Sequence, residues 1–352
     1  MDSPREPKQL PSSTHEVIVV LEEVHLVVDR FDTSPRSHEV ISYYRIAEAE
    51  EIRRRIQCAS IVITAQAFIT AESLGEAPYL KCVVTPTSGT NHVDLEECRR
   101  RGIRVAKCPG STSPAVAEHA LSLYFAARRK TVIFHNEIRA VDERGENSWK
   151  RQRSIAAKMQ MANGQPPCSI EEEIVGIIGH GHIGKRLETF CKALGMKVLI
   201  AERKNGVSVR NTTEKLSGRT PFDEVIKTAT VLFVSCASNR DTVNLIDAAE
   251  LHAMRPEVII VNVSRGNVLN TGEVIKALRE RRISGAAADV FDQEPASTEA
   301  DSAFLAEDTK DLNLTFSAHV GYFSSKTVVT MKAMVREQIK NFVDGNFTAF
   351  EV

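Results

Sequence analysis

The stretch VGIIGHGHIGKR at residues 175–186 constrains the fold more than any other, because an apolar run ends there in three glycines. Gly179, Gly181 and Gly184 have the spacing G-x-G-x-x-G, and an amphipathic run follows them directly. In that run, apolar residues recur in steps of four, three and four, as on one face of a helix. The stretch therefore predicts a strand, a tight turn and a helix, which together begin a parallel α/β sheet.

A loop of this kind can hold the pyrophosphate of a dinucleotide. Gly179 allows the tight turn, Gly181 lets the backbone approach the pyrophosphate, and Gly184 lets the helix pack closely on the strand. Free N–H groups at the start of the helix then face the anion. Glycines at this spacing also occur in ordinary turns, so the motif gains its weight from the strand before it and the helix after it.

The residues around the loop bear on which dinucleotide binds. Glu202 ends the next apolar run, where a carboxylate can accept hydrogen bonds from both ribose hydroxyls and would repel a 2′-phosphate. This favours NAD, with NADP as the alternative because Arg203 and Lys204 follow directly. His182 precedes Ile183 in the loop, and it either faces the pyrophosphate or is an exposed histidine.

The chain around this loop continues as an α/β series. Six short apolar runs alternate with helical patterns such as TGEVIKALRERR. These runs predict the strands of one parallel sheet: EEIVGIIG, KVLIAE, VLFVSCA, EVIIVNVS, ISGAAADVF and LNLTFSAH.

The first part of the chain predicts a second parallel sheet. The runs HEVIVVLEE, ASIVITA, LKCVVT and IRVAKC have the character of strands, and helical patterns occur between them. The two series meet near CPGSTSP, and a longer helix over 113–130 follows, with Pro114 in its first turn. We therefore expect an α/β protein with two domains of the Rossmann-like or flavodoxin-like kind.

Residues 131–172 form a long, polar segment that predicts an excursion from the main core. The segment contains Trp149, the only tryptophan, and other scattered apolar residues. Apolar residues on a long segment are rarely left in water, so we expect a homodimer in which this arm and the 113–130 helix contact the partner. The alternative is a flexible surface loop.

Composition excludes several function classes. The chain has 352 residues, a formal net charge of −1 and no basic tract, which gives no support to a nucleic-acid partner. No apolar run approaches the length of a membrane helix, and the polar N-terminus is no signal peptide. The seven cysteines include no C-x-x-C pair, as expected for free thiols in a reducing, cytoplasmic setting without a metal site.

Polar residues follow three successive predicted strands near the end of the second series. Arg265 lies in NVSRGNV, Asp289 and Glu294 lie in ADVFDQEP, and His319 lies in FSAHVG. Functional residues of open α/β sheets collect at the carboxyl ends of strands. Each residue alone has an ordinary structural explanation, but together they form a pattern that suits proton transfer and carboxylate binding.

With these motifs the chain resembles the D-isomer-specific 2-hydroxyacid dehydrogenases over roughly residues 80–325. SGTNHVDL is similar to that family's substrate loop, and AEHALSLYFAARR is similar to its long connecting helix. GHGHIGKRL, NVSRGNV, GAAADVFDQEP and SAHVG resemble its cofactor and catalytic motifs in the same order. The resemblance implies a cofactor domain of 113–321 and a discontinuous substrate domain of 1–112 and 322–352, because a helix near the chain's end returns to the first domain.

The resemblance also implies roles for individual residues. Arg265 would bind the substrate carboxylate and polarise its carbonyl, His319 would be the acid–base, and Glu294 would be its partner. Asp289 would lie near the nicotinamide, and the backbone around Ser88 and Gly89 would hold the carboxylate. The cofactor-binding set implied in this way is Gly179, Gly181, His182, Ile183, Gly184, Glu202, Arg203, Ala237 and Asp289.

The resemblance predicts reduction of a small 2-keto acid to its D-2-hydroxy acid, with glyoxylate or hydroxypyruvate as the favoured substrate. Formate dehydrogenases share the fold, but they carry glutamine where this chain has Glu294. An NAD-sensing corepressor on the same fold is the second alternative. The chain departs from the family pattern at Thr87, where another glycine is common, at Ala237 in place of a proline, and at Asn270 in place of an acid.

Overall fold

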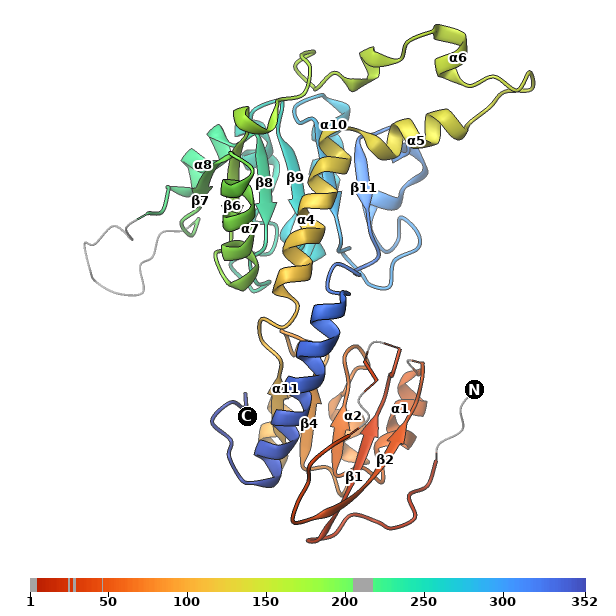
Figure 1. The fold of residues 1–352 in the computed structure, drawn as a ribbon, viewed down its shortest axis with the longest axis vertical. Helices are drawn as coiled ribbons and strands as arrows, with labels where there is room; N and C mark the ends of the chain where they lie inside the picture. The colour runs from red at the N-terminus through yellow and green to blue at the C-terminus, as the bar shows by residue number, and fades with distance from the viewer. Residues whose placement is uncertain (1–4, 25, 28–29, 46, 205–217) are drawn as a thin grey trace. The chain divides into compact units, whose positions relative to one another are not determined.

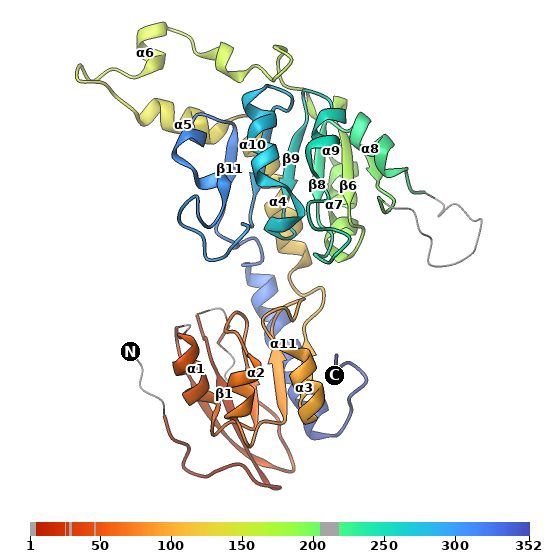
Figure 2. The ribbon, with the colours of Figure 1, turned by 180° about the vertical axis from the view of Figure 1, so that it is seen from behind.

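The computed structural model describes residues 5–352 apart from residues 25, 28–29, 46 and 205–217. The chain separates into two compact units, one of residues 1–112 with 323–352 and one of residues 113–322. Each unit is built on one parallel sheet (Figures 1 and 2). Two α/β units with parallel sheets confirm the predicted fold class.

The first unit has a five-stranded sheet in the order β2-β1-β3-β4-β5. Its strands are β1 (His15–Val20), β2 (Ser37–Ser42), β3 (Ile61–Ile63), β4 (Cys82–Thr85) and β5 (Arg104–Lys107). Its helices are α1 (Ala49–Ile56), α2 (Ala71–Gly75), α3 (Leu95–Arg101) and α11 (Ser325–Val343). Four of these strands match the predicted runs, whereas β2 was not predicted and lies at the edge of the sheet.

The last helix, α11, completes the core of the first unit. Alternate residues of β1 face opposite sides of the sheet, so that Val17 and Val19 lie in one apolar cluster and Ile18 and Val20 in the other. The second cluster includes Met331, Val335, Ile339 and Phe342 of α11. A segment more than 200 residues away in sequence therefore covers one face of this sheet, beside β4 and β5.

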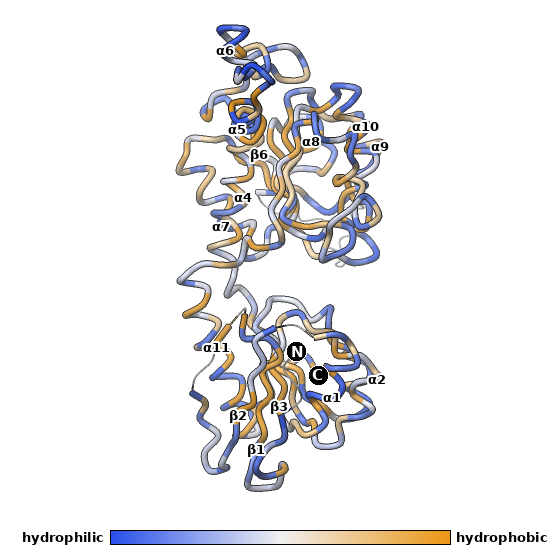
Figure 3. The backbone as a smooth tube through the Cα atoms, turned by 90° about the vertical axis from the view of Figure 1, so that its right-hand side faces the viewer, coloured by the Kyte–Doolittle hydropathy of each residue, from blue (hydrophilic) through white to orange (hydrophobic). Residues whose placement is uncertain are grey.

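The second unit has a six-stranded sheet in the order β11-β10-β9-β8-β6-β7. Its strands are β6 (Ile174–Ile178), β7 (Lys197–Ile200), β8 (Val231–Val234), β9 (Ile259–Asn262), β10 (Gly285–Ala288) and β11 (Leu314–Phe316). All six coincide with the predicted apolar runs. Helices cover both faces of the sheet and most of its strands are hydrophobic along their length (Figure 3), whereas the edge strand β7 begins with the exposed Lys197.

Two sets of helices cover this second sheet. Apolar residues of α4 (Ser113–Arg128) and α7 (His182–Ala193) share one cluster with the sheet. Residues of α8 (Phe222–Thr228), α9 (Ala248–Ala253) and α10 (Thr271–Arg279) share the cluster on the opposite face. The segment after α4 leaves this three-layered body as α5 (Thr131–Arg139) and α6 (Ser148–Gln152), which Figure 1 shows extending away from the sheet.

Candidate active site

The glycine loop lies at the point where the order of the second sheet reverses. The chain passes from β6 to β7 on one side, and later returns to β8 on the other side of β6. Ligands of open α/β sheets bind outside the carboxyl ends of the strands at such a reversal. The loop at residues 179–181 joins the carboxyl end of β6 to α7, so it occupies this position.

The three glycines serve the loop in different ways. Gly179 has a left-handed φ of 91°, and a Cβ there would lie 2.5 Å from the amide nitrogen of Cys236. A Cβ on Gly184 would lie 2.1 Å from the carbonyl oxygen of Gly179. Gly181 caps α7, and a Cβ there would meet no atom within 4 Å. The open position at the start of a twelve-residue helix fits the pyrophosphate of a dinucleotide.

The side chains beside the glycines have separate environments. His182 is exposed, whereas Ile183 packs against the apolar cluster of the sheet. His180, which was not assigned a role, contacts Glu188 with its Nε2 2.6 Å from the carboxylate. Hydrogen bonds from Lys192 and His180 lower the pKa of Glu188 despite partial burial.

His319 and Glu294 form a pair at the carboxyl ends of β11 and β10. Nδ1 of His319 lies 2.5 Å from Oε2 of Glu294, and the side chains are 39% and 31% exposed. The other carboxylate oxygen accepts a hydrogen bond of 2.9 Å from the amide of Phe291. Because Nδ1 is bonded to Glu294, Nε2 is the ring nitrogen of His319 that does not contact this carboxylate.

The charge state of Glu294 follows from its neighbours. Burial alone would raise the pKa of this carboxyl, but the hydrogen bond and charge of His319, the amide of Phe291 and the charge of Arg265 outweigh burial. The net effect lowers the pKa of Glu294 below its usual value, so the group is ionised at neutral pH. Arg265 thus belongs to the same electrostatic site as the pair.

Arg265 is positioned by the turn that follows β9. Asn262, at the end of that strand, donates from Nδ2 to the carbonyl of Arg265 at 2.8 Å. Oδ1 of Asn262 accepts hydrogen bonds from the amide and the hydroxyl of Ser264. The half-buried Arg265 donates from one guanidinium nitrogen to the carbonyl of Ser264 at 2.7 Å. Asn262 is 1% exposed and therefore supports the turn from within.

Asp289 lies beneath the loop that carries His319. It is 3% exposed and accepts hydrogen bonds from the hydroxyl of Ser317 and from the amides of Val320 and Gly321. His119 of α4 contacts both Ser317 and Asp289. Sequence reasoning placed His119 inside a helix pattern without assigning it a role.

Residues 122–321 match the family model of the D-isomer specific 2-hydroxyacid dehydrogenase NAD-binding domain, which is more than half of the chain. The chain belongs to this family. The glyoxylate reductase of Thermococcus gammatolerans is 33% identical over 279 residues, covering 79% of this chain and 77% of the relative. The glycerate dehydrogenase of Methylorubrum extorquens is 28% identical over 309 residues, covering 88% and 90%.

A solved dehydrogenase structure has the same fold as this family member. The D-lactate dehydrogenase of Aquifex aeolicus, complexed with NAD and lactic acid, superimposes with a TM-score of 0.69 at 21% identity. The match covers 96% of this chain and 99% of the other. At 21% identity, the structural similarity shows that the two chains share a fold.

Glu202, the residue predicted to bind the ribose, lies just after β7. Glu202 is half-buried, and its amide donates to the carbonyl of Thr220 at 2.9 Å. Lys204 pairs with Glu250 of α9 at 2.9 Å, whereas Arg203 is exposed. The charge of Lys204 is therefore offset by Glu250, whereas Arg203 and Arg219, which donates to the carbonyl of Ala201 at 3.3 Å, are cations beside Glu202 that could compete with it.

Ser88 and Gly89 follow β4 in the first unit. Ser88 is exposed, and the hydroxyl of Thr87 donates to the carbonyl of Gly89 at 2.5 Å. A threonine in place of a family glycine thus bonds within the loop.

Ala237 follows β8, where its carbonyl accepts a hydrogen bond of 2.8 Å from Thr242. Asn270 caps α10 by accepting from the amide of Glu273, a role that asparagine performs well.

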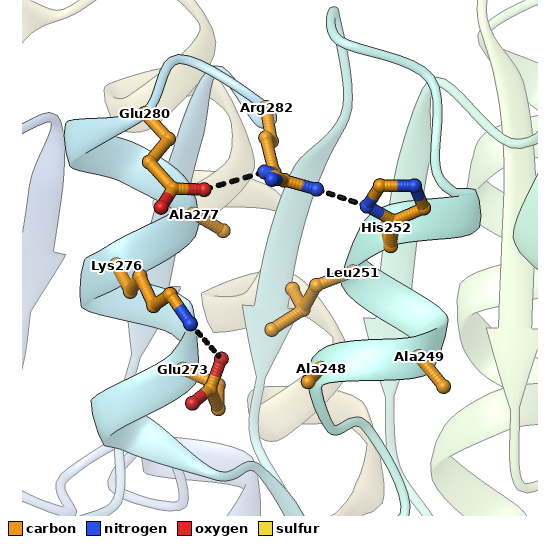
Figure 4. A pocket seen from close by; sticks show the side chains of 9 residues that line it. All are labelled: Ala248, Ala249, Leu251, His252, Glu273, Lys276, Ala277, Glu280 and Arg282. Carbon is orange, nitrogen blue, oxygen red and sulfur yellow. Dashed lines mark hydrogen bonds and ion pairs between the residues drawn. The ribbon is translucent and has the colours of Figure 1, made fainter.

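A separate hollow of about 370 Å³ opens between α9 and α10, and none of its lining residues belongs to the predicted site (Figure 4). Its charged side chains contact one another, with Arg282 bonded to both Glu280 and His252.

In the part of the chain that the structure describes, no group of three or more His, Cys, Asp or Glu side chains could hold a metal ion. No helix among the described residues is long and apolar enough to span a bilayer.

Proposed function

We propose that this chain reduces a small 2-keto acid to its D-2-hydroxy acid with NADH, and that it catalyses the reverse oxidation. The observation that carries the proposal is the His319–Glu294 pair of 2.5 Å beside the charge of Arg265. The names of the glyoxylate reductase and glycerate dehydrogenase relatives support glyoxylate or hydroxypyruvate as the substrate.

The residues of the chain would divide the reaction between them. Bound NADH supplies a hydride to C2 of the keto acid, which leaves negative charge on the carbonyl oxygen. Arg265 binds the carboxylate and polarises the carbonyl, because its guanidinium keeps its charge and can bond two oxygens. His319 donates the proton from Nε2 to the oxygen, while Glu294 holds the opposite nitrogen and favours the protonated ring.

Two alternatives remain on the same fold. Formate oxidation removes a hydride without removing a proton from an alcohol, so an ionised glutamate bonded to the histidine favours the hydroxyacid reaction. An NAD-sensing binding protein would retain the cofactor loop without turnover. The relatives named as reductases and dehydrogenases favour an enzyme.

A panel of 2-keto acids with NADH and NADPH in parallel tests the proposal. We expect NADH oxidation with glyoxylate or hydroxypyruvate, and a D-2-hydroxy acid product from hydroxypyruvate. NADH binding without turnover on any member of the panel would support the sensor. Formate-dependent reduction of NAD without keto-acid turnover would support the formate alternative.

The position of Glu202 leads to a prediction about cofactor choice. Glu202→Ser removes the charge that would repel a 2′-phosphate and leaves Arg203 available to attract it. We expect the ratio of kcat/KM for NADPH over NADH to rise by about tenfold or more, which corresponds to about 1.4 kcal/mol. Glu224→Ser, an exposed acid on α8, is the control. A wild-type enzyme that already prefers NADPH would show that Arg203 dominates.

The arm at residues 131–172 leads to a prediction about assembly. Val132, Ile138 and Trp149 are 40%, 40% and 56% exposed, so the arm presents apolar surface to solvent. We propose that a second copy of the chain covers this surface through the arm and the 113–130 helix. Sedimentation should show a dimer at micromolar concentration, and Trp149→Glu should weaken it. A wild-type monomer under these conditions would contradict the proposal.

A further inference from the structure

His319 has an unusual backbone conformation for a side-chain-bearing residue. Its φ is +49°, in the left-handed region that most residues avoid. Such a conformation persists only where the surrounding structure imposes it. The loop that presents the imidazole to Glu294 therefore needs a feature that selects this conformation.

The buried carboxylate of Asp289 supplies that feature. The amide of Val320 donates to Oδ1 at 3.0 Å, and the amide of Gly321 donates to Oδ2 at 2.9 Å. Successive N–H groups beside a left-handed residue form a concave site for an anion. Here the anion is a side chain of the same unit, and it bonds the two residues that follow His319.

The same carboxylate also bonds the residue two positions before His319. The hydroxyl of Ser317 donates to Oδ1 of Asp289 at 2.6 Å, and Ser317 in turn contacts Nε2 of His119 at 2.7 Å. Nε2 of His119 lies 3.5 Å from Oδ1 of Asp289. The carboxylate thus holds the loop on both sides of His319, and α4 contributes His119 to the same network.

Packing around the carboxylate leaves no room for variation at Gly321. A Cβ there would lie 2.7 Å from Oδ2 of Asp289 and 2.9 Å from Cδ2 of His119. Burial acts to raise the pKa of Asp289, but hydrogen bonds from His119, Ser317 and the two amides outweigh it and lower that pKa. The group is therefore an anion at neutral pH, and its charge strengthens the hydrogen bonds from the two amides.

We infer that Asp289, supported by Ser317 and His119, is a positioning residue that holds His319 in its left-handed conformation and so directs the imidazole toward Glu294. The inference rests on the proposed function, in which His319 transfers the proton. It gives Asp289 a positioning role in addition to the place near the nicotinamide that the resemblance implies.

Asp289→Asn tests this inference, because it keeps the shape of the side chain and removes the charge and one acceptor. We expect kcat for reduction to fall by about 10²-fold, the effect of misplacing a catalytic group by about 1 Å, with a much smaller change in the Kd for NADH. Asp301→Asn is the matched control, since Asp301 also accepts from two successive amides, those of Ser297 and Thr298.

Two further readouts separate positioning from general stability. In the double variant with Glu294→Gln, the two losses should be much less than multiplicative, because both act through His319. His119→Gln, which keeps a donor for Ser317, should retain more activity than His119→Ala. These His119 variants also keep the inference testable if Asp289→Asn does not fold.

A nuclear magnetic resonance titration of the His319 ring can be measured without any turnover of substrate. The signal of the ring is assigned as the one that is missing from the spectrum of His319→Gln. A changed titration midpoint in Asp289→Asn, but not in Asp301→Asn, supports the inference even if no keto acid is reduced. An unchanged midpoint together with weaker NADH binding would overturn it in favour of a cofactor contact. The inference would also be overturned, in favour of a structural role for Asp289, if the losses of kcat in the double variant were multiplicative and ran parallel to a fall in the melting temperature.

Discussion

Replacement of His319 by alanine is expected to lower turnover of the 2-keto acid by about 10²–10⁴-fold, the usual contribution of general acid–base catalysis. The reason is that the imidazole bonded to Glu294 is the group assigned to deliver the proton to the carbonyl oxygen. NADH binding should stay nearly unchanged, because the side chain is not assigned to the dinucleotide. Stopped-flow or steady-state rates at saturating NADH measure the loss.

The control for this variant is His252→Ala. His252 lies on α9, where it contacts Arg282 and none of the predicted site residues. Its replacement should leave turnover within a factor of about two. A loss of less than threefold in His319→Ala would show that another group transfers the proton.

Breaking the buried ion pair of Arg128 and Glu173 is expected to have the largest effect on stability. The two residues are 1% and 0% exposed, and the guanidinium donates to Oε2 of Glu173 at 2.9 Å. The hydroxyl of Tyr124 donates to the other carboxylate oxygen at 2.9 Å. Arg128 also donates to the carbonyls of Glu257 and Thr230. The pair therefore joins the end of α4 to the segments that precede three strands of the sheet.

Glu173→Gln leaves the guanidinium buried without its counter-charge. Removing one partner of a buried pair typically costs about 3–5 kcal/mol of unfolding free energy. Urea unfolding followed by circular dichroism measures this loss in the second unit. Glu146→Gln, which removes an exposed pair with Lys150, should cost less than about 1 kcal/mol. Equal losses in the two variants would contradict the role given to the buried pair.

The second sheet could be predicted from sequence because most of its strands are buried on both faces. Such strands are nearly continuous apolar runs, and each of the six was identified in that way. The strand β2 escaped prediction because SHEVIS lies at the edge of its sheet, with Ile41 as its single buried residue. Its polar residues face solvent and give no apolar run or regular alternation.

The candidate site could be predicted in part for a similar reason. Arg265, Glu294 and His319 follow predicted strands at the carboxyl edge of one sheet, and the structure brings Glu294 and His319 into contact. His119 and Asn262 could not be identified in this way, because each is a single polar residue within a helix or strand pattern. Their contacts with Ser317 and Ser264 depend on tertiary packing and leave no periodic signal.

The pH dependence of reduction in Glu294→Gln tests the central claim most directly. The pKa of Glu294 is lowered, so its charge is present at neutral pH and favours the protonated form of the adjacent imidazole. Glutamine keeps the shape and a hydrogen bond but removes the charge, so the ring loses its proton at lower pH. Reduction needs that proton, so its rate in Glu294→Gln should begin to fall at a pH about one unit lower than in the wild type. Oxidation at high pH should be less affected. If the rate of reduction falls at the same high pH in the wild type and in Glu294→Gln, the proposed role of the His319–Glu294 pair is contradicted.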